Sequence, residues 1–341
     1  MRPKVICLTP VRNEGWILEK FLACASLWAD HIIVADQHSE DRSVEIALGF
    51  EKVTLIRNPE LGFNEPERQK MLIDAARRIP GPRLLVALDA DEFLTPNFFD
   101  GPEWTRALSA PPGTAILAKR ENIRPDFRYY WTDAEILIGY VDDGLEHAGL
   151  PIHSCRLPFS SEAPKMAMDE IRLLHYQYTD WDRMSSKHRW YLCWERINNP
   201  RRSPVGLYRQ YHHMYGLGDG SLKEAPGWWF EGYAKHGIDM RNTPREGNYW
   251  WDREVLRLFE EHGAEKFKRD AVWSTDWVMK ARTLNVDNPD RFIDPRSIFD
   301  KAVQLWLAKT QANNARVWVR FVDKCLSALW RLRLAMYGSA R

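Results

Sequence analysis

The chain has 341 residues, of which 45% are hydrophobic and 28% charged, and its formal net charge is +1. A chain of this length and composition can bury a large core, which is typical of one catalytic domain with an appendage. The near-zero net charge provides no global basic field, which argues against a nucleic-acid-binding protein.

The five cysteines form no C-x-x-C pair, which favours buried free thiols in a reducing compartment over disulfides or a zinc site. The first predicted strand begins at residue 4 with no apolar segment before it, so we expect no signal peptide. No run of about 18 apolar residues occurs, so we expect no transmembrane helix. These features together predict a cytoplasmic protein.

Predicted strands and helices alternate over the first hundred residues. Short apolar runs predict buried strands at 4–10, 31–35, 53–57 and 84–88, and the stretches 16–28, 44–50 and 65–78 are expected to be helical. This alternation is typical of a doubly wound, mostly parallel α/β sheet. Polar clusters follow three of these strands, at the edge where such a sheet binds its ligands.

The strand at 84–88 ends in Asp89-Ala90-Asp91-Glu92. Two carboxylates with one residue between them, placed where a buried strand ends, offer hard oxygen ligands that suit Mg²⁺ or Mn²⁺. A diphosphate and water would then fill the remaining positions around the ion. Because strands often end in acidic residues, a surface turn rich in Asp is the alternative explanation of this motif taken alone.

The motifs resemble those of GT-A fold glycosyltransferases and are similar to glycosyltransferase family 2. The resemblance is carried by Pro10-Val11-Arg12-Asn13-Glu14 after the first strand, by Asp36, Ser39 and Asp41 after the second, by Arg68 on a later helix and by Leu88–Glu92. One departure is His38, where many relatives have Gly. Local turn geometry or the preference for a sugar nucleotide is therefore expected to differ.

The resemblance implies a nucleotide-diphosphate sugar donor, whose leaving diphosphate is neutralised by a divalent metal held at Asp91. Asp36 would accept a hydrogen bond from the nucleobase, Glu14 would reach a ribose hydroxyl, and Arg68 would approach the diphosphate. Asp89 would ligate the metal or act through the ribose or a water. The rest of the expected donor site consists of Pro10, Arg12, Asn13 and Ser39. A solvated helix charge is the alternative for Arg68.

The middle of the chain is expected to complete the sheet and to form the acceptor side. A strand is predicted at 114–119, an aromatic platform for sugar at 129–131, and a strand-like segment at 171–178 that contains His175. The resemblance implies that His175 is a further metal ligand, with His153 a weaker candidate; a buried histidine satisfied by its neighbours is the alternative. The predicted helix 181–196 is basic, and its charges would meet an anionic ligand or form a solvated face.

An inverting transferase needs a carboxylate that removes the proton from the acceptor hydroxyl. Several acidic residues between the metal motif and His175 qualify, and the sequence does not choose among them: Asp142, Asp143, Glu146, Asp169 and Glu170. We take Asp169, Glu170 and Glu146 as the candidates.

The last third of the chain differs in character. Residues 216–310 are dense in tryptophan, for which packing is favoured over sugar stacking. Residues 311–341 predict a basic amphipathic helix, with one cationic stripe (Arg316, Arg320, Lys324) beside an apolar face (Val317, Phe321, Cys325, Leu329). Together with Trp318 and Trp330, this pattern suits the surface of an anionic membrane, whereas packing against the same or another chain is the alternative.

The sequence therefore predicts an α/β protein with a GT-A catalytic domain at 1–215, divided into a nucleotide-binding half (1–112) and an acceptor half (113–215), followed by helical extensions at 216–310 and 311–341. We expect a glycosyltransferase that uses Mn²⁺ or Mg²⁺ to transfer a sugar, with inversion, to a glycan or glycolipid, as in bacterial surface polysaccharide or lipopolysaccharide synthesis.

Two other functions compete with this one. A nucleotidyltransferase would usually carry a Gly-rich phosphate loop after the first strand, and Thr9–Gly15 is not such a loop. A catalytically inactive sugar-binding module would not need the intact Asp36, Asp89 and Asp91.

Overall fold

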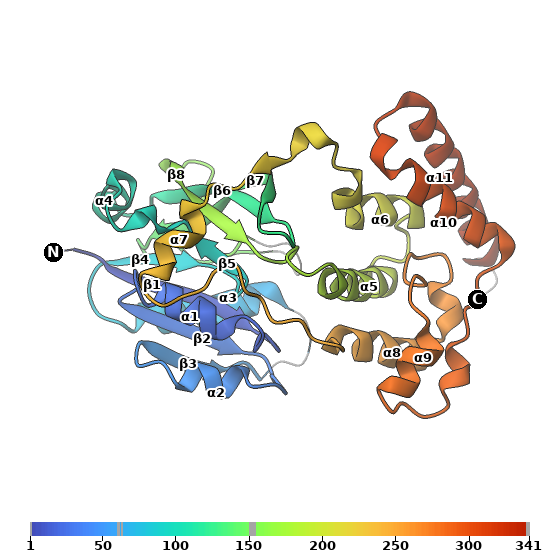
Figure 1. Ribbon diagram of the computed structural model, residues 1–341, viewed down its shortest axis with the longest axis horizontal. Helices are drawn as coiled ribbons and strands as arrows, with labels where there is room; N and C mark the ends of the chain where they lie inside the picture. The colour runs from blue at the N-terminus through green and yellow to red at the C-terminus, as the bar shows by residue number, and fades with distance from the viewer. Residues whose placement is uncertain (1, 60–61, 63, 150–154, 339–341) are drawn as a thin grey trace. The chain divides into compact units, whose positions relative to one another are not determined.

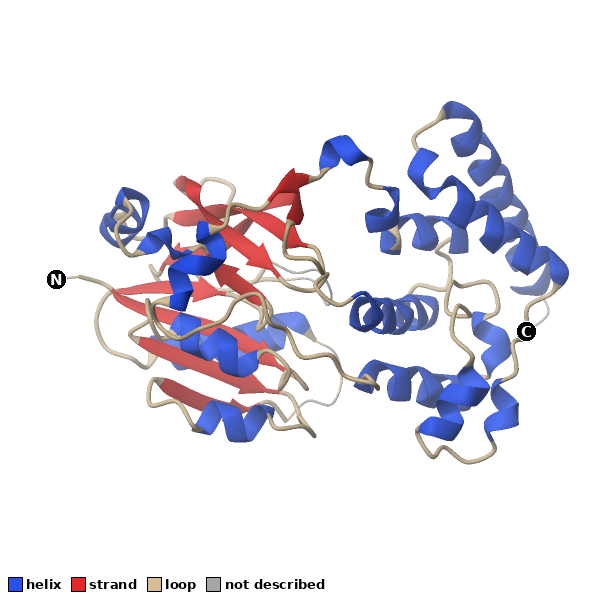
Figure 2. Ribbon diagram, in the orientation of Figure 1, coloured by secondary structure: helices blue, strands red, loops and turns tan. Residues whose placement is uncertain are grey.

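The computed structural model describes residues 2–59, 62, 64–149 and 155–338 (Figure 1). The chain forms two compact units. The α/β unit comprises the chain up to Asp180 together with Lys223–Arg245, and the helical unit comprises Trp181–Leu222 and the chain from Glu246 onward. Figure 2 shows that the sheet belongs to the first unit and that the second is built from helices.

The α/β unit contains one nine-stranded sheet in the order β3-β2-β1-β4-β7-β6-β8-β5, with β9 paired to β7. Its parallel half consists of β1 (Lys4–Val11), β2 (His31–Asp36), β3 (Val53–Arg57) and β4 (Arg83–Ala87). The other half consists of β5 (Glu92–Leu94), β6 (Ala115–Ile123), β7 (Tyr129–Val141), β8 (Lys165–His175) and β9 (Lys223–Glu224).

Among the described strands, β5 and β7 run against the direction of the rest, because β4–β7, β6–β7, β7–β9 and β5–β8 are the antiparallel pairs. The sheet is therefore mixed but mostly parallel. The α/β fold class with a C-terminal helical extension is confirmed.

Helices cover both faces of the sheet. They are α1 (Leu18–Ala25), α2 (Ser43–Leu48), α3 (Glu65–Arg77), α4 (Pro102–Ser109) and α7 (Trp228–Ala234). Alternate residues of β1 point to opposite faces, so Val5 and Cys7 lie in one apolar core, whereas Ile6 and Leu8 lie in a second core with residues of α3. The sequence pattern predicted β1 to β4 and α3 to within a few residues.

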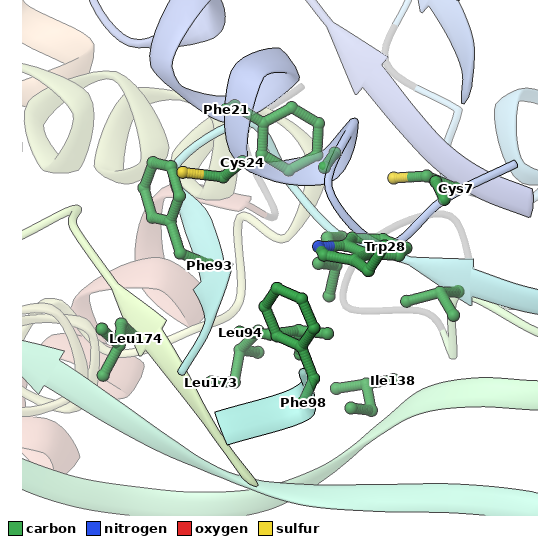
Figure 3. Packing of buried hydrophobic residues seen from close by; sticks show 14 of the residues in the cluster. Cys7, Phe21, Cys24, Trp28, Phe93, Leu94, Phe98, Ile138, Leu173 and Leu174 are labelled. Carbon is green, nitrogen blue, oxygen red and sulfur yellow. The ribbon is translucent and has the colours of Figure 1, made fainter. Parts of the chain in front are cut away.

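The larger core contains two of the cysteines. Figure 3 shows Cys24 between Phe21 of α1 and Phe93 of β5, two rings whose centroids are 6.2 Å apart. Burial raises the pKa of the Cys24 thiol and of the Cys7 thiol, so both remain protonated. The expected buried free thiols are present at these two positions.

The division into units differs from the predicted domain boundary at residue 215. The segment Lys223–Arg245 returns to the α/β unit, where β9 extends the sheet and α7 packs on the larger core. The Tyr233 hydroxyl donates to the Leu94 carbonyl at 2.5 Å. Gly232 lies so close to Pro96 that a Cβ atom would overlap the proline ring, so this contact requires glycine.

The helical unit begins with the segment that we expected to close the acceptor half. Its helices are α5 (Trp181–Asn198), α6 (Pro204–Tyr211), α8 (Trp250–His262), α9 (Trp277–Thr283), α10 (Ile298–Thr310) and α11 (Val317–Gly338). Trp251 is 4% exposed, as is Trp229 in α7, which confirms packing for these two residues, whereas Trp228 is 45% exposed. No helix in the described part of the chain combines the length and apolarity that crossing a membrane requires.

The cations of α5 have a structural role. Arg189 Nη2 lies 2.9 Å from Asp252, and Arg196 Nη2 lies 2.7 Å from Asp270, with all four side chains buried. Asp252 also lies 3.1 Å from Lys280 Nζ. Such buried charges need partners, since a lone buried charge is costly. Both explanations offered from the sequence, an anion site and a solvated face, are therefore wrong for Arg189 and Arg196.

Candidate functional site

The first, second and fourth strands end at the same edge of the sheet. The parallel register places Val11 beside Asp36 and Leu8 beside Ala87. The polar segments that follow β1 and β2 therefore start level with each other, and the one that follows β4 starts a few residues earlier at the same edge. In open α/β sheets this is the edge that binds ligands.

The loops after β1 and β2 hold each other in place. The Asn13 amide donates to Ser39 Oγ at 2.9 Å, and Asn13 Oδ1 accepts from the Glu40 amide at 2.7 Å. The Gly15 amide donates to Asp41 Oδ2 at 2.8 Å. The two motifs that carried the resemblance thus form one hydrogen-bonded structure, in which Ser39 and Asp41 satisfy backbone groups of the other loop.

His38 adopts the left-handed backbone conformation, with φ of 53°. Glycine reaches this region without strain, so the turn keeps the geometry of a Gly position although it carries a histidine. The Nε2 atom of His38 lies 3.1 Å from the Pro59 carbonyl oxygen. The expected difference from relatives, in turn geometry or in sugar-nucleotide preference, remains a prediction.

Asp36 is 1% exposed at the end of β2. Its Oδ2 accepts from Arg57 Nη1 at 3.1 Å, and its Oδ1 accepts from the Ser39 amide at 3.4 Å. On the neighbouring loop, Glu14 Oε2 accepts from Trp16 Nε1 at 2.7 Å. The nucleobase and ribose roles of Asp36 and Glu14 remain predictions.

The other expected donor residues lie on the same elements. Pro10 lies in β1, and Arg12 is the first residue after this strand. Arg68 is half-buried in the first turns of α3, a helix that follows β3 and packs against β1 and β2. Because a helix that follows a parallel strand starts at the carboxyl edge of the sheet, Arg68 lies on the side where β1, β2 and β4 end.

Asp91 and His175 face each other across two paired strands. The β5–β8 register places Glu92 beside His175, and the Tyr176 amide donates to the Asp91 carbonyl at 2.8 Å. His175 Nε2 lies 3.8 Å from Asp91 Oδ2, and each residue is 7% exposed. Two ligands that each lie about 2.1 Å from one ion are at most about 4.2 Å apart, so this pair fits a shared Mn²⁺ or Mg²⁺.

Asn122 sets the proton position on the His175 ring. His175 Nδ1 lies 2.7 Å from Asn122 Oδ1, an atom that only accepts. The Asn122 amide nitrogen points to the Trp131 carbonyl at 3.5 Å and donates to Asp133, which fixes which end of the amide faces the ring. The proton therefore resides on Nδ1, and Nε2, which faces Asp91, is the nitrogen suited to a metal.

Arg156 bridges two acidic residues of the metal motif, and sequence reasoning missed it. Its Nη2 lies 2.6 Å from Asp89 Oδ2 and 3.1 Å from Glu92 Oε1, and Nη1 also donates to Glu92. Burial raises the pKa of Glu92, but the Arg156 charge, the Arg156 hydrogen bonds and His175 together outweigh burial and the net pKa is lowered, so Glu92 is ionised at 0% exposure. No local motif marks an arginine that pairs with a residue 64 positions away.

The predicted three-ligand set of Asp89, Asp91 and His175 does not converge. No group of three or more His, Cys, Asp and Glu side chains is arranged to hold a metal within residues 2–59, 62, 64–149 and 155–338. The physical reason is Arg156, which draws the Asp89 carboxylate into an ion pair. The protein side of the candidate metal site thus consists of Asp91 and His175.

The predicted bases Asp169 and Glu170 lie in a bulge of β8. Their amides and the next one donate to the Glu103 carboxylate, and Asp169 pairs with Lys119 at 3.4 Å. Lys119 is three residues before Asn122, the partner of His175, on β6, or about 10 Å along the strand. The structure therefore does not bring Asp169 and Glu170 together with Asp91.

The remaining expected residues are placed as follows. Glu146 is exposed in the segment after β7 and shares no described interaction with Asp91. Asp142 is a structural residue that pairs with Arg77 and Arg83 at 2.8 and 3.0 Å. His153 lies outside the described residues.

The predicted aromatic platform at 129–131 is part of the packed sheet. Trp131 is 2% exposed and its ring centroid lies 4.7 Å from that of Tyr178. Tyr130 packs on Trp229 at 4.8 Å. These contacts explain the aromatic cluster without a sugar.

No family model matches the sequence, and no curated protein matches it. Solved structures do match. The glucosyl-3-phosphoglycerate synthase of Mycobacterium tuberculosis, in complex with Mn²⁺, uridine diphosphate and phosphoglyceric acid, is 20% identical over 35% of this chain and 43% of its own, with a TM-score of 0.26. TarS of S. aureus is 10% identical over 91% of this chain and 88% of its own, at 0.35.

HddC of Yersinia pseudotuberculosis is 11% identical over 54% of this chain and 96% of its own, with a TM-score of 0.32. This chain spans less than half of the length of the mycobacterial synthase.

Proposed function

We propose that this chain is a metal-dependent GT-A glycosyltransferase that transfers a sugar from a nucleotide-diphosphate donor to a glycan or glycolipid acceptor. The observation that carries the proposal is the buried pair of Asp91 and His175, whose facing side-chain atoms are 3.8 Å apart. The loops that follow β1 and β2 in the same sheet, where the donor nucleotide would bind, are hydrogen-bonded to each other. Acidic and imidazole ligands of this kind suit Mn²⁺ better than Ca²⁺.

Asp91 and His175 would hold the cation, which would act as a Lewis acid on the departing diphosphate. Asn122 keeps the ring of His175 in the required orientation. Arg68 would meet a phosphate oxygen from the start of α3, and Asp36 and Glu14 would bind the nucleoside. Arg156 and the buried Glu92 keep the turn between β4 and β5 in one conformation.

The acceptor side and the stereochemistry are further parts of the proposal. We infer inversion, with a carboxylate as the base, and a place in the synthesis of a bacterial surface polysaccharide or lipopolysaccharide. The base would be a carboxylate other than Asp169 and Glu170, because the amides of these two residues are bound by Glu103 in the bulge of β8.

Isothermal titration of the protein with nucleoside diphosphates, with and without MnCl₂, tests the donor and metal sites. UDP and Mn²⁺, the ligands of the mycobacterial complex, serve as first probes, followed by GDP, CDP and ADP. We expect binding that requires Mn²⁺ and that Asp91→Asn weakens by more than about tenfold, since second-shell changes alone cost 10–100-fold at metal sites.

Asp74→Asn is the matched control, because Asp74 lies in the same unit, at the exposed surface of α3, in an i,i+4 pair with Lys70. Its titration should equal that of the unchanged protein. Metal-independent binding, or full binding by Asp91→Asn, would contradict the metal assignment. Release of nucleoside diphosphate from a sugar nucleotide separates a transferase from an inactive sugar-binding module. Pyrophosphate release from a nucleoside triphosphate and a sugar phosphate would identify a nucleotidyltransferase instead.

A further inference from the structure

Exposed apolar side chains are concentrated on the last two helices of the helical unit. Fifteen large apolar side chains are exposed in the described part of the chain, and eight of them lie between residues 298 and 332. They are Ile298, Phe299 and Leu305 in α10, and Val317, Trp318, Phe321, Leu329 and Leu332 in α11. Val317 and Phe321 are 84% and 67% exposed. The two helices adjoin, because the ring centroid of Trp306 in α10 lies 5.6 Å from that of Trp318 in α11. A concentration of exposed apolar side chains on adjoining helices is typical of an interaction site.

The exposed charges of the same segment are cationic. Lys309, Arg316, Arg320, Lys324 and Arg331 are exposed, and none of them has an acidic partner among the described ion pairs. Some exposed cations elsewhere pair with neighbouring acids, as Arg42 does with Glu45 and Arg257 with Glu254.

The two acidic residues of α10 and α11 face inward. Asp300 caps α10 in a reciprocal box with Ser297. Asp323 accepts from Arg209 at 2.9 Å and from Trp306 Nε1 at 3.1 Å. Hence no carboxylate of these helices offsets the five outward cations.

The opposite side of α11 is fixed by packing. Val319 is 0% and Trp330 8% exposed, and the Arg196 guanidinium lies 5.2 Å from the centroid of the Trp330 ring. The sequence placed Trp330 on the membrane-facing side, and the structure corrects this: Trp330 anchors the helix and Trp318 remains outside. α11 is thus held in place by its buried side, and the exposed apolar side chains on its outer side take no part in that packing.

We propose that this outer face, formed by the exposed apolar and basic side chains of α10 and α11 and termed here the α10–α11 surface, binds the surface of an anionic lipid bilayer. The apolar side chains would enter the headgroup region and the cations would meet lipid phosphates, as in helices that lie in the membrane plane. Neither helix is long and apolar enough to span a bilayer, within the described residues, so the segment lies on the membrane.

Charge selects the bilayer over a second copy of the chain. A symmetric dimer through this surface would place two sets of five unpaired cations against each other, which is unfavourable in a desolvated interface. A bilayer with anionic lipids supplies both the apolar phase and the opposite charge. The proposal stands independently of the transferase function, although a membrane-borne glycolipid acceptor would be consistent with it.

Vesicle co-sedimentation of the full chain tests the proposal. The probes are vesicles of phosphatidylcholine with 40% phosphatidylglycerol and vesicles of phosphatidylcholine alone, at low and high salt. We expect binding to the anionic vesicles that weakens with salt, because each Lys or Arg near such a surface contributes about fivefold in partitioning. Replacing Arg316, Arg320 and Lys324 together by serine should then reduce the partition coefficient about 100-fold.

Matched controls exclude a general effect of charge or hydrophobicity. Arg201, Arg253 and Lys266 are exposed cations elsewhere in the helical unit, and their replacement by serine removes the same three charges. Phe321→Ser is paired with Leu48→Ser, a site in α2 that is 69% exposed. Only the variants of the α10–α11 surface should lose binding, and Asp91→Asn should bind vesicles normally.

The proposal is overturned by absent binding, by equal binding to both vesicle types, or by equal losses in the surface and control variants. A dimer in light scattering that Phe321→Ser dissociates would replace the bilayer by a second copy. Deleting α11 is not an equivalent test, because it would also remove Val319 and Trp330 from the core.

Discussion

Removing the positive charge of Arg156 is expected to destabilise the protein by about 3 kcal/mol. In Arg156→Met, Glu92 remains as a carboxylate at 0% exposure and loses its two hydrogen bonds from the guanidinium. Breaking a buried ion pair from one side costs about 3–5 kcal/mol. Arg120 remains 4.0 Å from Glu92 and Arg156 is itself 21% exposed, so the lower end of this range applies.

The free energy of unfolding is measured by urea titration at pH 7 and pH 5. In the unchanged protein the pKa of Glu92 is lowered: burial raises it, and the Arg156 charge and hydrogen bonds outweigh burial. The ionised Glu92 therefore contributes to the stability of the fold. This contribution is present above the ordinary pKa of glutamate and is lost only as the pH falls through the lower pKa that Glu92 has in the folded protein. Without Arg156, burial raises the pKa of Glu92, so protonation relieves the penalty and the difference between the two proteins should narrow at pH 5.

A double-mutant cycle decides whether the unpaired charge of Glu92 causes the loss of stability in Arg156→Met. Arg156→Met should cost less than half as much in a Glu92→Gln background, because the neutral amide needs no counter-charge. Arg128→Met is the control: Arg128 is 65% exposed and pairs with Glu224 at the surface, so its loss should change stability far less than the loss of Arg156 does. An equal cost of Arg156→Met in both backgrounds, or a cost no larger than that of the control, would refute the reasoning.

Three other changes probe the site and the helical unit. Asn122→Leu should lower Mn²⁺ affinity about 10–100-fold, because the ring of His175 loses the acceptor that orients it. Manganese titration followed by electron paramagnetic resonance measures this affinity. An unaltered affinity would mean that Asn122 contributes only to packing. Asp36→Ala should weaken nucleoside diphosphate binding by about 1–3 kcal/mol, and a complex with the base far from Asp36 would contradict the assignment. Burial lowers the pKa of His188 to about 3 and that of His212 to about 4, so both are neutral in the fold, whereas the unfolded chain takes up protons below about pH 6.5. Stability should therefore fall between pH 6.5 and pH 4, and His188→Gln should flatten that decline in urea titrations at four pH values.

The parallel half of the sheet could be predicted because its signals are local. Each of β1 to β4 is a short apolar run with a polar segment at its end, and the resemblance named the same residues that the structure joins, such as Asn13 with Ser39. The antiparallel half could not be predicted in this way. Asn122 and His175 meet through the pairing of β6 with β8, which includes a register shift that no periodicity reports. Arg156 reaches Glu92 from the segment between β7 and β8.

Charge patterns were the least reliable signal. The arginines of α5 looked like a solvated or ligand-binding face, yet Arg189 and Arg196 are buried in ion pairs with Asp252 and Asp270. Both acids come from distant segments, so the sequence spacing of the cations carried no information about their partners. At the start of α11 a similar run of cations does lie at the surface, since Arg316, just before the helix, and Arg320 within it are both exposed.

The balance of charge around the motif supports a divalent cation rather than an ordinary acidic turn. Three carboxylates and two guanidiniums are linked by ion pairs around the β5–β8 pairing, namely Asp89, Glu92 and Asp133 with Arg120 and Arg156, and a fourth carboxylate, Asp91, lies beside them against His175. The four carboxylates and the two guanidiniums sum to a formal charge of −2. Each arginine is already shared between two acids, and an uncompensated charge in a partly buried cluster is costly. A divalent cation at Asp91 brings this sum to zero, and the diphosphate it attracts can then be met by cations outside the cluster, for which Arg68 on α3 is the candidate.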